Sequence, residues 1–141
     1  MSEYETAMVA VGFIVREGKI FVAKRAKTKK NFPGRYELVG GHIDRGESPE
    51  QTIIREIKEE IGIEVEVGQI VGAFTFEVGG EFEIEVAYLC YPLTDAEPVL
   101  DPNEHSEAMW IGESEVYKME KDDEETDMLK QAFKMIKGDI K

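Results

Sequence analysis

Three glutamates, Glu56, Glu59 and Glu60, lie within two turns of a predicted helix. Side chains three or four positions apart are neighbours on a helix, so Glu56 is next to both of the others. Each such like-charge pair costs roughly 0.2–0.5 kcal/mol when exposed, a cost that a lysine or arginine at one position would remove. The residues alone leave two interpretations: a solvated acidic face, or a site for Mg²⁺ or Mn²⁺, which prefer hard oxygen ligands.

The helix that carries these glutamates has clear start and stop signals. Ser48 can cap its N-terminus, Gln51 completes a capping box, Pro49 suits the first helical position and Gly62 can end the helix. At about 100° per residue, four isoleucines fall in one arc and the glutamates fall in a neighbouring arc. The isoleucines are Ile53, Ile54, Ile57 and Ile61. We therefore expect a core face and a separate carboxylate face.

Strand-like runs lie on both sides of this helix. Residues 7–16 and 19–26 predict a hairpin, "RYELVGG" predicts a short strand ending in glycines, and "SEAMWIG" predicts a strand later in the chain. The last segment predicts an amphipathic helix that packs on the sheet. Its apolar positions are Leu129, Ala132, Phe133 and Ile136, with Met128 and Met135 as further packing residues and Gly138 near its end. This order favours helices packed against a mixed sheet.

A second hairpin is expected around Gly79 and Gly80. A two-residue turn there would pair Phe76 with Glu83 and mix apolar with acidic residues on one face, whereas a three-residue loop from Val78 to Gly80 would keep them apart. We therefore predict the longer loop with a glycine bulge, which pairs Phe76 with Phe82 and Phe74 with Ile84. Glu81, Glu83 and Glu85 would then share a wetter face, either solvated or lining a cleft.

Composition restricts the classes of partner. Residues 1–141 are enough for one compact domain, and 17 Lys and Arg against 30 Asp and Glu give a formal charge of −13. This charge does not suit a protein that grips nucleic acid by neutralising phosphates. No apolar run approaches the roughly 18 residues that span a bilayer, and the apolar run near the N-terminus follows the acidic "SEYE" rather than a basic region. We expect no membrane span and no secretory signal.

The single cysteine, Cys90, cannot form an internal disulfide, which fits a reducing, cytoplasmic location. It lies in the apolar run "VAYLCYPL", where we interpret it as a buried structural thiol. His42 and His105 are the only histidines, and two isolated imidazoles make no zinc cluster. We interpret both as polar loop residues, with His105 able to assist at a cleft. The acidic segment 119–127 is interpreted as the solvated start of the last helix.

The stretch from Gly41 to Ile63 satisfies the pattern GX5EX7REUXEEXGU, in which U is aliphatic. Its specified positions are Gly41, Glu47, Arg55, Glu56, Ile57, Glu59, Glu60, Gly62 and Ile63. This pattern resembles the Nudix box, the signature of the Nudix hydrolases, and "IFVAKRA", "GRYELVGG" and "MWIGESEV" resemble the family's strands around it. Val39 and Tyr36 depart from the proline and tryptophan of many members, which affects the loop shape and substrate pocket rather than the metal ligands.

The resemblance implies an α/β fold, the Nudix-type α/β/α sandwich with a mixed β-sheet between helices. It also implies hydrolysis of a nucleoside diphosphate linked to another group, with Mg²⁺ or Mn²⁺ and water. By resemblance, Glu56, Glu59 and Glu60 carry the metal ions with a carbonyl of Gly40 or Gly41, while Glu47 and Arg55 pair to support the loop. The charge logic agrees, because cations must neutralise the phosphoryl oxygens during pyrophosphate hydrolysis.

The general base varies within the family that the sequence resembles. Glu56 serves in some members and a glutamate outside the box in others, so Glu104 and Glu107, which precede Trp110, are further candidates here. By the same resemblance, Arg25 is either a substrate contact or an ordinary exposed arginine, and Leu38 is a further expected substrate contact. The basic cluster of Lys27, Lys29 and Lys30 either steers an anionic substrate or only adds solubility.

The substrate expected first is a (d)NTP, including oxidised dNTPs, in nucleotide-pool housekeeping, and ADP-ribose or a nucleotide sugar comes next. A non-catalytic nucleotide sensor would usually have a degraded box, whereas this box is intact. An isopentenyl diphosphate isomerase would need a catalytic cysteine, whereas Cys90 lies in a strand-like run well after the box. Many relatives pair, so a homodimer is expected.

Overall fold

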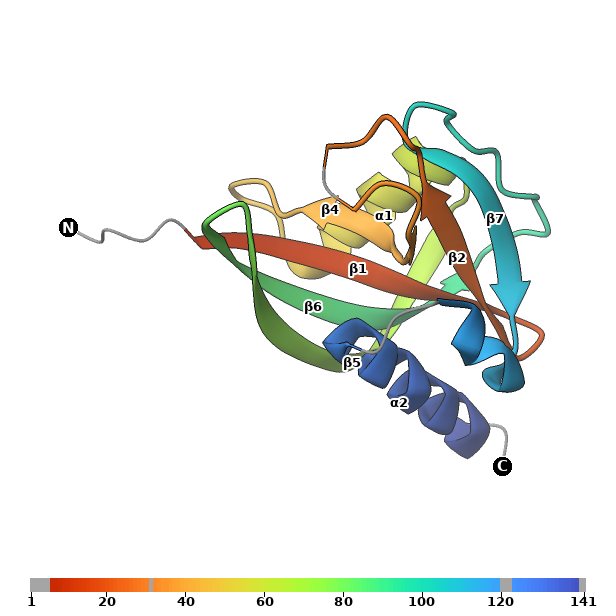
Figure 1. The fold of residues 1–141 in the computed structure, drawn as a ribbon. Coiled ribbons are helices and arrows are strands. Elements are labelled where there is room, and N and C mark those ends of the chain that lie inside the picture. The colour runs from red at the N-terminus through yellow and green to blue at the C-terminus, as the bar shows by residue number, and fades with distance from the viewer. Residues whose placement is uncertain (1–5, 31, 120–122, 140–141) are drawn as a thin grey trace.

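A computed structural model describes residues 6–30, 32–119 and 123–139 (Figure 1). Seven strands, two α-helices and one 3₁₀ helix follow one another in these ranges. In chain order they are β1 (Thr6–Arg16), β2 (Lys19–Arg25), β3 (Tyr36–Glu37), β4 (Val39–His42), α1 (Pro49–Ile61), β5 (Val65–Val78), β6 (Glu81–Pro92), β7 (His105–Ile111), η1 (Glu113–Met119) and α2 (Glu124–Asp139). The predicted first hairpin is confirmed, with Glu17 and Gly18 at its turn.

Strand β1 is the centre of the sheet. It runs parallel to β6 from Thr6 to Ile14, and its other edge pairs antiparallel first with β4 and then with β2. Strand β5 lies outside β6, while β3 and β7 both pair with β2. Because parallel and antiparallel pairs coexist, the expected mixed sheet is confirmed.

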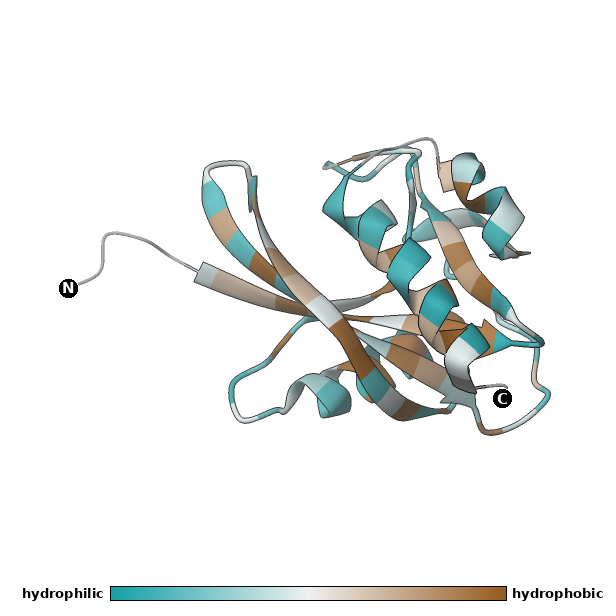
Figure 2. Ribbon diagram, turned by 90° about the horizontal axis from the view of Figure 1, so that it is seen from below, coloured by the Kyte–Doolittle hydropathy of each residue, from teal (hydrophilic) through white to brown (hydrophobic). Residues whose placement is uncertain are grey.

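Two apolar cores lie on opposite faces of this sheet. One contains α1 through Ile53, Ile57 and Ile61, and the other contains α2 through Leu129 and Phe133. Figure 2 shows largely hydrophilic residues on the side of α2 that faces away from the strands. Helices therefore cover both faces, which confirms the α/β class and the layered architecture expected from the sequence.

Helix α1 begins and ends where its local signals predicted. The Ser48 hydroxyl accepts from the Gln51 backbone N–H, the Gln51 side chain accepts from the Ser48 N–H, and Gly62 ends the helix with φ 71°. Ile54 was wrongly assigned to the core, because its side chain is 42% exposed while Thr52 is fully buried. Thr52 can be buried because its hydroxyl donates a hydrogen bond to Glu47.

The predicted three-residue loop of the second hairpin was wrong. Val78 pairs with Glu81, Phe76 pairs with Glu83, and Gly79 and Gly80 form a two-residue turn with φ of 56° and 84°. Two glycines in the left-handed region match the twist of the flanking strands, and this turn preference outweighs the cost of mixing residue types on one face. Phe76 and Glu83 consequently share one face of the sheet, and Glu83 is only 7% exposed.

The C-terminal helix packs on the sheet as expected. Met128 is buried in its core and Met135 packs against that core. Helix α2 continues to Asp139, so Gly138 lies inside its last turn. The interpretation of segment 119–127 falls partly on residues 120–122, which are outside the described residues. In the described ranges, none of the helices has the length and apolar character needed to cross a membrane.

Candidate active site

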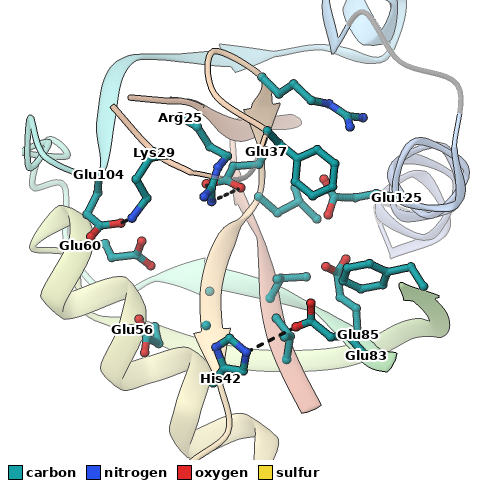
Figure 3. A pocket seen from close by; sticks show the side chains of 18 of the residues that line it. Arg25, Lys29, Glu37, His42, Glu56, Glu60, Glu83, Glu85, Glu104 and Glu125 are labelled. Carbon is teal, nitrogen blue, oxygen red and sulfur yellow. Dashed lines mark hydrogen bonds and ion pairs between the residues drawn. The ribbon is translucent and has the colours of Figure 1, made fainter. Parts of the chain in front are cut away.

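A cavity of about 820 Å³ opens beside the sheet and collects side chains from most of the chain (Figure 3). Its lining includes the three glutamates of the carboxylate face, Glu56, Glu59 and Glu60. Gly40, Gly41, Arg25, Leu38 and Glu104, also predicted from the sequence, line the same cavity. The fold therefore brings together predicted site residues that are up to 79 positions apart in the chain, since 104 − 25 = 79.

The wall from α1 is crowded with charge. Arg55 Nη1 lies 2.9 Å from Glu56 Oε1 and 3.3 Å from Glu59 Oε2. Burial raises the pKa of Glu56, although the Arg55 hydrogen bond opposes that shift. The guanidinium thus offsets part of the repulsion that the sequence predicts on this face.

Glu60 is the least compensated carboxylate of the three. Its Oε2 atom is buried and has no hydrogen-bond partner within the described residues. Burial, and then the neighbouring Glu56 charge, raise the pKa of Glu60 to about 8. An ionised carboxylate in this position would be stabilised by a cation near its orphan oxygen.

This donor set fits a hard divalent cation, because it offers carboxylate oxygens, one of them without a partner, next to the backbone of a glycine pair. Within residues 6–30, 32–119 and 123–139, however, no three acidic, histidine or cysteine side chains already converge on one point. The three glutamates line one wall of the cavity, and Arg55 lies between the first two.

The loop before α1 is held by Glu47 and Arg55. Arg55 donates from Nε to Glu47 Oε2 at 2.8 Å and from Nη2 to Glu47 Oε1 at 2.9 Å. The hydrogen bond from Arg55 lowers the pKa of Glu47 to about 2. The two residues that were expected to support the loop are therefore in bidentate contact, the strongest geometry for such a pair.

Basic side chains line the same cavity as the α1 glutamates. Arg25 Nη1 donates to Glu37 Oε1 at 3.1 Å, and Lys29 Nζ donates to Glu104 Oε2 at 2.7 Å. In Figure 3, Glu60 and Glu104 lie on one side of the cavity while Arg25 and Glu37 lie near its centre. The negative charges of Glu104 and Glu37 also raise the pKa of Glu60, which places all three carboxylates in one electrostatic environment.

Other predicted residues lie elsewhere. Among the described residues, Glu107, Lys27 and Lys30 do not line the cavity, and Glu107 accepts a hydrogen bond from the Tyr36 hydroxyl at 3.0 Å. His42, in contrast, lines the cavity: it ends β4 rather than lying in a loop as predicted, and its Nε2 is 3.3 Å from Glu83 Oε1. His105 was wrongly interpreted as a loop residue, because it begins β7 and is only 1% exposed.

The far end of the cavity combines aromatic rings with buried carboxylates. Phe74 and Phe76 have ring centroids 5.6 Å apart, and the strand register pairs them with Glu85 and Glu83. Figure 3 places Glu83, Glu85 and Glu125 on the side away from Glu60 and Glu104. An apolar surface and a set of hydrogen-bond acceptors thus lie at some distance from the α1 glutamates.

A family model for the NUDIX domain matches residues 6–132. The chain belongs to the Nudix family. Members of this family are pyrophosphohydrolases that act on nucleotide anhydrides, so the protein is an enzyme of that class. Nudix hydrolases generally use divalent metal ions, in agreement with the donor set on α1.

Named relatives of this Nudix hydrolase differ in substrate. A CTP pyrophosphohydrolase of Escherichia coli (strain K12) is 32% identical over 107 residues, which cover 76% of each chain. An 8-oxo-dGTP diphosphatase of the same strain is 43% identical over 56 residues, covering 39% of this chain and 43% of that one. A crystal structure of the MutT protein from Methanosarcina mazei Go1 gives a TM-score of 0.82 at 24% identity and covers 97% of this chain and 99% of that one, which supports the fold.

Several cavity residues of this Nudix hydrolase were not found by sequence reasoning. Glu37 stands alone between apolar neighbours in a two-residue strand and carries no local signal. Phe74 and Phe76 were predicted on the face opposite to Glu83 and Glu85, whereas they share that face and line the cavity. The signal for Glu83 and Glu85 was their alternation with apolar residues, which marks one face of a strand without saying whether that face is solvated.

Proposed function

We propose that this Nudix hydrolase cleaves a phosphoanhydride bond of nucleoside triphosphates, including oxidised deoxynucleotides, with Mg²⁺ or Mn²⁺. One observation carries the proposal: a single cavity presents the α1 carboxylates, the cations Arg25 and Lys29, and a separate aromatic end. The carboxylates suit the metal ion that accompanies a triphosphate, the basic side chains suit its phosphates, and the aromatic end suits its base. The CTP and 8-oxo-dGTP relatives support a triphosphate, and ADP-ribose is the alternative substrate.

Glu56, Glu59 and Glu60 would hold the cation, together with a carbonyl of Gly40 or Gly41. When bound, a divalent cation neutralises phosphoryl oxygens and lowers the pKa of water. Arg25 and Lys29 bind the remaining phosphate oxygens, Arg25 through its planar fork and Lys29 as a point charge. Leu38, which is 4% exposed, gives the substrate an apolar contact beside Arg25.

Glu56 and Glu104 are the bases to compare, because both line the cavity, whereas Glu107 does not and accepts a hydrogen bond from Tyr36. The base removes a proton from the attacking water, and the Lys29 ammonium next to Glu104 would then stabilise the phosphate that leaves. Glu104→Gln should lower kcat by more than about tenfold if Glu104 is the base. A smaller loss would make Glu56 the preferred base.

The base-binding end favours nucleobases that carry an exocyclic amino group. The carboxylates of Glu83 and Glu85 are hydrogen-bond acceptors, and the amino group of cytosine, adenine or guanine offers two N–H donors, whereas uracil and thymine offer only the single N3–H. Phe74 and Phe76 offer surfaces on which the base can stack. Cytosine, adenine and guanine nucleotides are therefore the expected substrates.

Chromatography of the nucleotide products formed from a panel of nucleotides with Mg²⁺ tests this function. We expect turnover of triphosphates such as CTP and 8-oxo-dGTP, slower turnover of UTP and dTTP, and loss of turnover in Glu59→Gln. Glu50→Gln is the matched control, because Glu50 is exposed on the same helix and, in the described structure, does not line the cavity. Faster cleavage of ADP-ribose than of every triphosphate would refute the substrate, and tight binding without turnover would indicate a sensor.

The homodimer and the cytoplasmic location are also proposals. They are supported only by the habits of the family and by the unpaired Cys90. Sedimentation equilibrium of the purified chain distinguishes a monomer of 16.0 kDa from a dimer.

A further inference from the structure

Three polar side chains form a chain of hydrogen bonds beneath the cavity. His105 Nε2 lies 2.9 Å from Glu37 Oε2, and Arg25 Nη1 donates to Oε1 of the same carboxylate at 3.1 Å and to Oε2 at 3.3 Å. Glu37 and Arg25 line the cavity, whereas His105 lies behind them and is 1% exposed. The buried imidazole is thus connected to the cavity through Glu37.

The strand register explains why these three residues meet. Lys24 pairs with Glu107 while Arg25 pairs with His105, so Ser106 is an extra residue in β7 and the ladder shifts at this point. A bulge of this kind changes the direction of the side chains next to it. Glu37 lies in β3 next to Tyr36, and Tyr36 pairs with Lys24 of β2, so the strand pairing brings Glu37 close to Arg25.

Burial of His105 has a free-energy cost, the loss of hydrogen bonding at one ring nitrogen, that packing does not explain. Its Nδ1 atom is buried and has no partner within the described residues. A carboxylate oxygen accepts, so the bond to Glu37 needs a hydrogen on Nε2, whereas Nδ1 makes no corresponding bond. A leucine would fill such a site without this penalty, so the bond to Glu37 is the feature that a histidine provides.

We propose that His105 is a positioning residue for substrate phosphate: it holds Glu37, and Glu37 in turn fixes the direction of the Arg25 guanidinium in the cavity. Both carboxylate oxygens of Glu37 take part in the network, one facing Arg25 alone and one shared with His105. A guanidinium that is already oriented loses less freedom when it binds phosphate, which strengthens binding without altering the chemical step. The role of Arg25 rests on the proposed function.

Two substitutions of His105 separate positioning from stability. Glutamine places an N–H donor near the position of Nε2, whereas leucine fills the space without a donor. We expect His105→Leu to raise KM about tenfold with kcat within about threefold, and His105→Gln to restore KM to within about threefold of the wild type. Ile111→Val, a buried substitution in the same strand, controls for lost packing and should leave KM unchanged while lowering the urea midpoint.

The Arg25→Lys background supplies a second test. Lysine lacks the planar fork that Glu37 orients, so His105→Leu should raise KM there by less than about twofold. Equal effects in both backgrounds would overturn the proposal. An equal loss in His105→Gln and His105→Leu, at equal urea midpoints, would overturn it as well.

A binding measurement separates this inference from the proposed function. Isothermal titration with inorganic pyrophosphate and Mg²⁺ should show a Kd about tenfold weaker in His105→Leu and near normal in His105→Gln. If the wild type hydrolyses no nucleotide but this pattern holds, the positioning role stands and the proposed function falls. A Kd that is the same in all three proteins, or wild-type protein that binds no pyrophosphate, overturns the positioning role.

Discussion

The backbone of Gly41 lies directly against the carboxylate of Glu56. A Cβ built at position 41 would be 2.5 Å from the Glu56 carboxyl carbon and 2.7 and 2.8 Å from its two oxygens. At Gly40 the same construction meets the Ala10 carbonyl oxygen at 2.1 Å, which is backbone and cannot move aside. Each glycine therefore excludes a side chain for a different reason.

Gly41→Ala should move the Glu56 carboxylate without unfolding the protein, because the clash is with the far end of a side chain. We expect kcat/KM to fall by at least about tenfold, since small displacements of site groups have large effects on rate. Gly138→Ala, at a helical position with nothing within 4 Å of an added Cβ, is the control and should be neutral or stabilise by about 0.5–1 kcal/mol. Steady-state kinetics and urea unfolding measure both effects, and a normal rate in Gly41→Ala would contradict the assignment of Glu56.

Glu85→Gln should change which base is preferred. Glutamine offers a donor as well as an acceptor, so it can meet the carbonyl oxygen of uracil that a carboxylate repels. The ratio of kcat/KM for CTP to that for UTP should fall by at least about fivefold. Glu81→Gln, which is exposed on the same strand, should leave the ratio unchanged. An unaltered ratio in Glu85→Gln would place the base elsewhere.

Glu47 should give the protein an acid-sensitive component of stability. Its pKa in the folded protein is lowered from 4.5 to about 2, so the stabilisation is present above pH 4.5 and is lost as the pH falls toward 2. Urea unfolding of the wild type and Glu47→Gln should show a difference in unfolding free energy near pH 6 that shrinks between pH 4.5 and 2. A pH-independent difference would mean that the charge of Glu47 is not what Arg55 stabilises.

Cys90 should be inert in the folded chain. Its side chain is fully buried and burial raises the pKa of the thiol to about 12, so little thiolate exists at pH 8. An aromatic disulfide reagent should therefore label Cys90 only as fast as the protein opens, and urea should accelerate labelling. Rapid labelling of the native protein would restore the isomerase interpretation, which requires a reactive cysteine.

Local signals in the sequence were sufficient to predict the ends of α1 and the face that carries its three glutamates. Ser48, Gln51 and Gly62 act on groups within a few residues of themselves, and the spacing of the three glutamates fixes which face they share. The pairing of Glu47 with Arg55 follows from the box pattern: Glu47 lies in the loop just before α1, and Arg55 lies in α1 itself. These features depend on short stretches of chain.

Features that depend on distant strands were harder to predict. The turn at Gly79 and Gly80 was resolved by backbone dihedral angles rather than by the apolar pattern, and the change of one residue in the loop put Phe76 on the same face of the sheet as Glu83. The burial of His105 depends on the bulge where β7 meets β2. Neither the bulge nor its partner across the sheet has a signal in the sequence near residue 105.

One unbroken strand, β1, holds β4 along its first half and β2 at its end. The spacing between the glycine pair and Arg25 is thus fixed by backbone hydrogen bonds, whatever side chains surround them. Phe74, Phe76, Glu83 and Glu85 lie on β5 and β6, beyond the opposite edge of that strand. Substitutions at the positions that we propose to contact the base would therefore leave the distance between the glycine pair and Arg25 unchanged, so that one scaffold could serve different nucleotides during evolution.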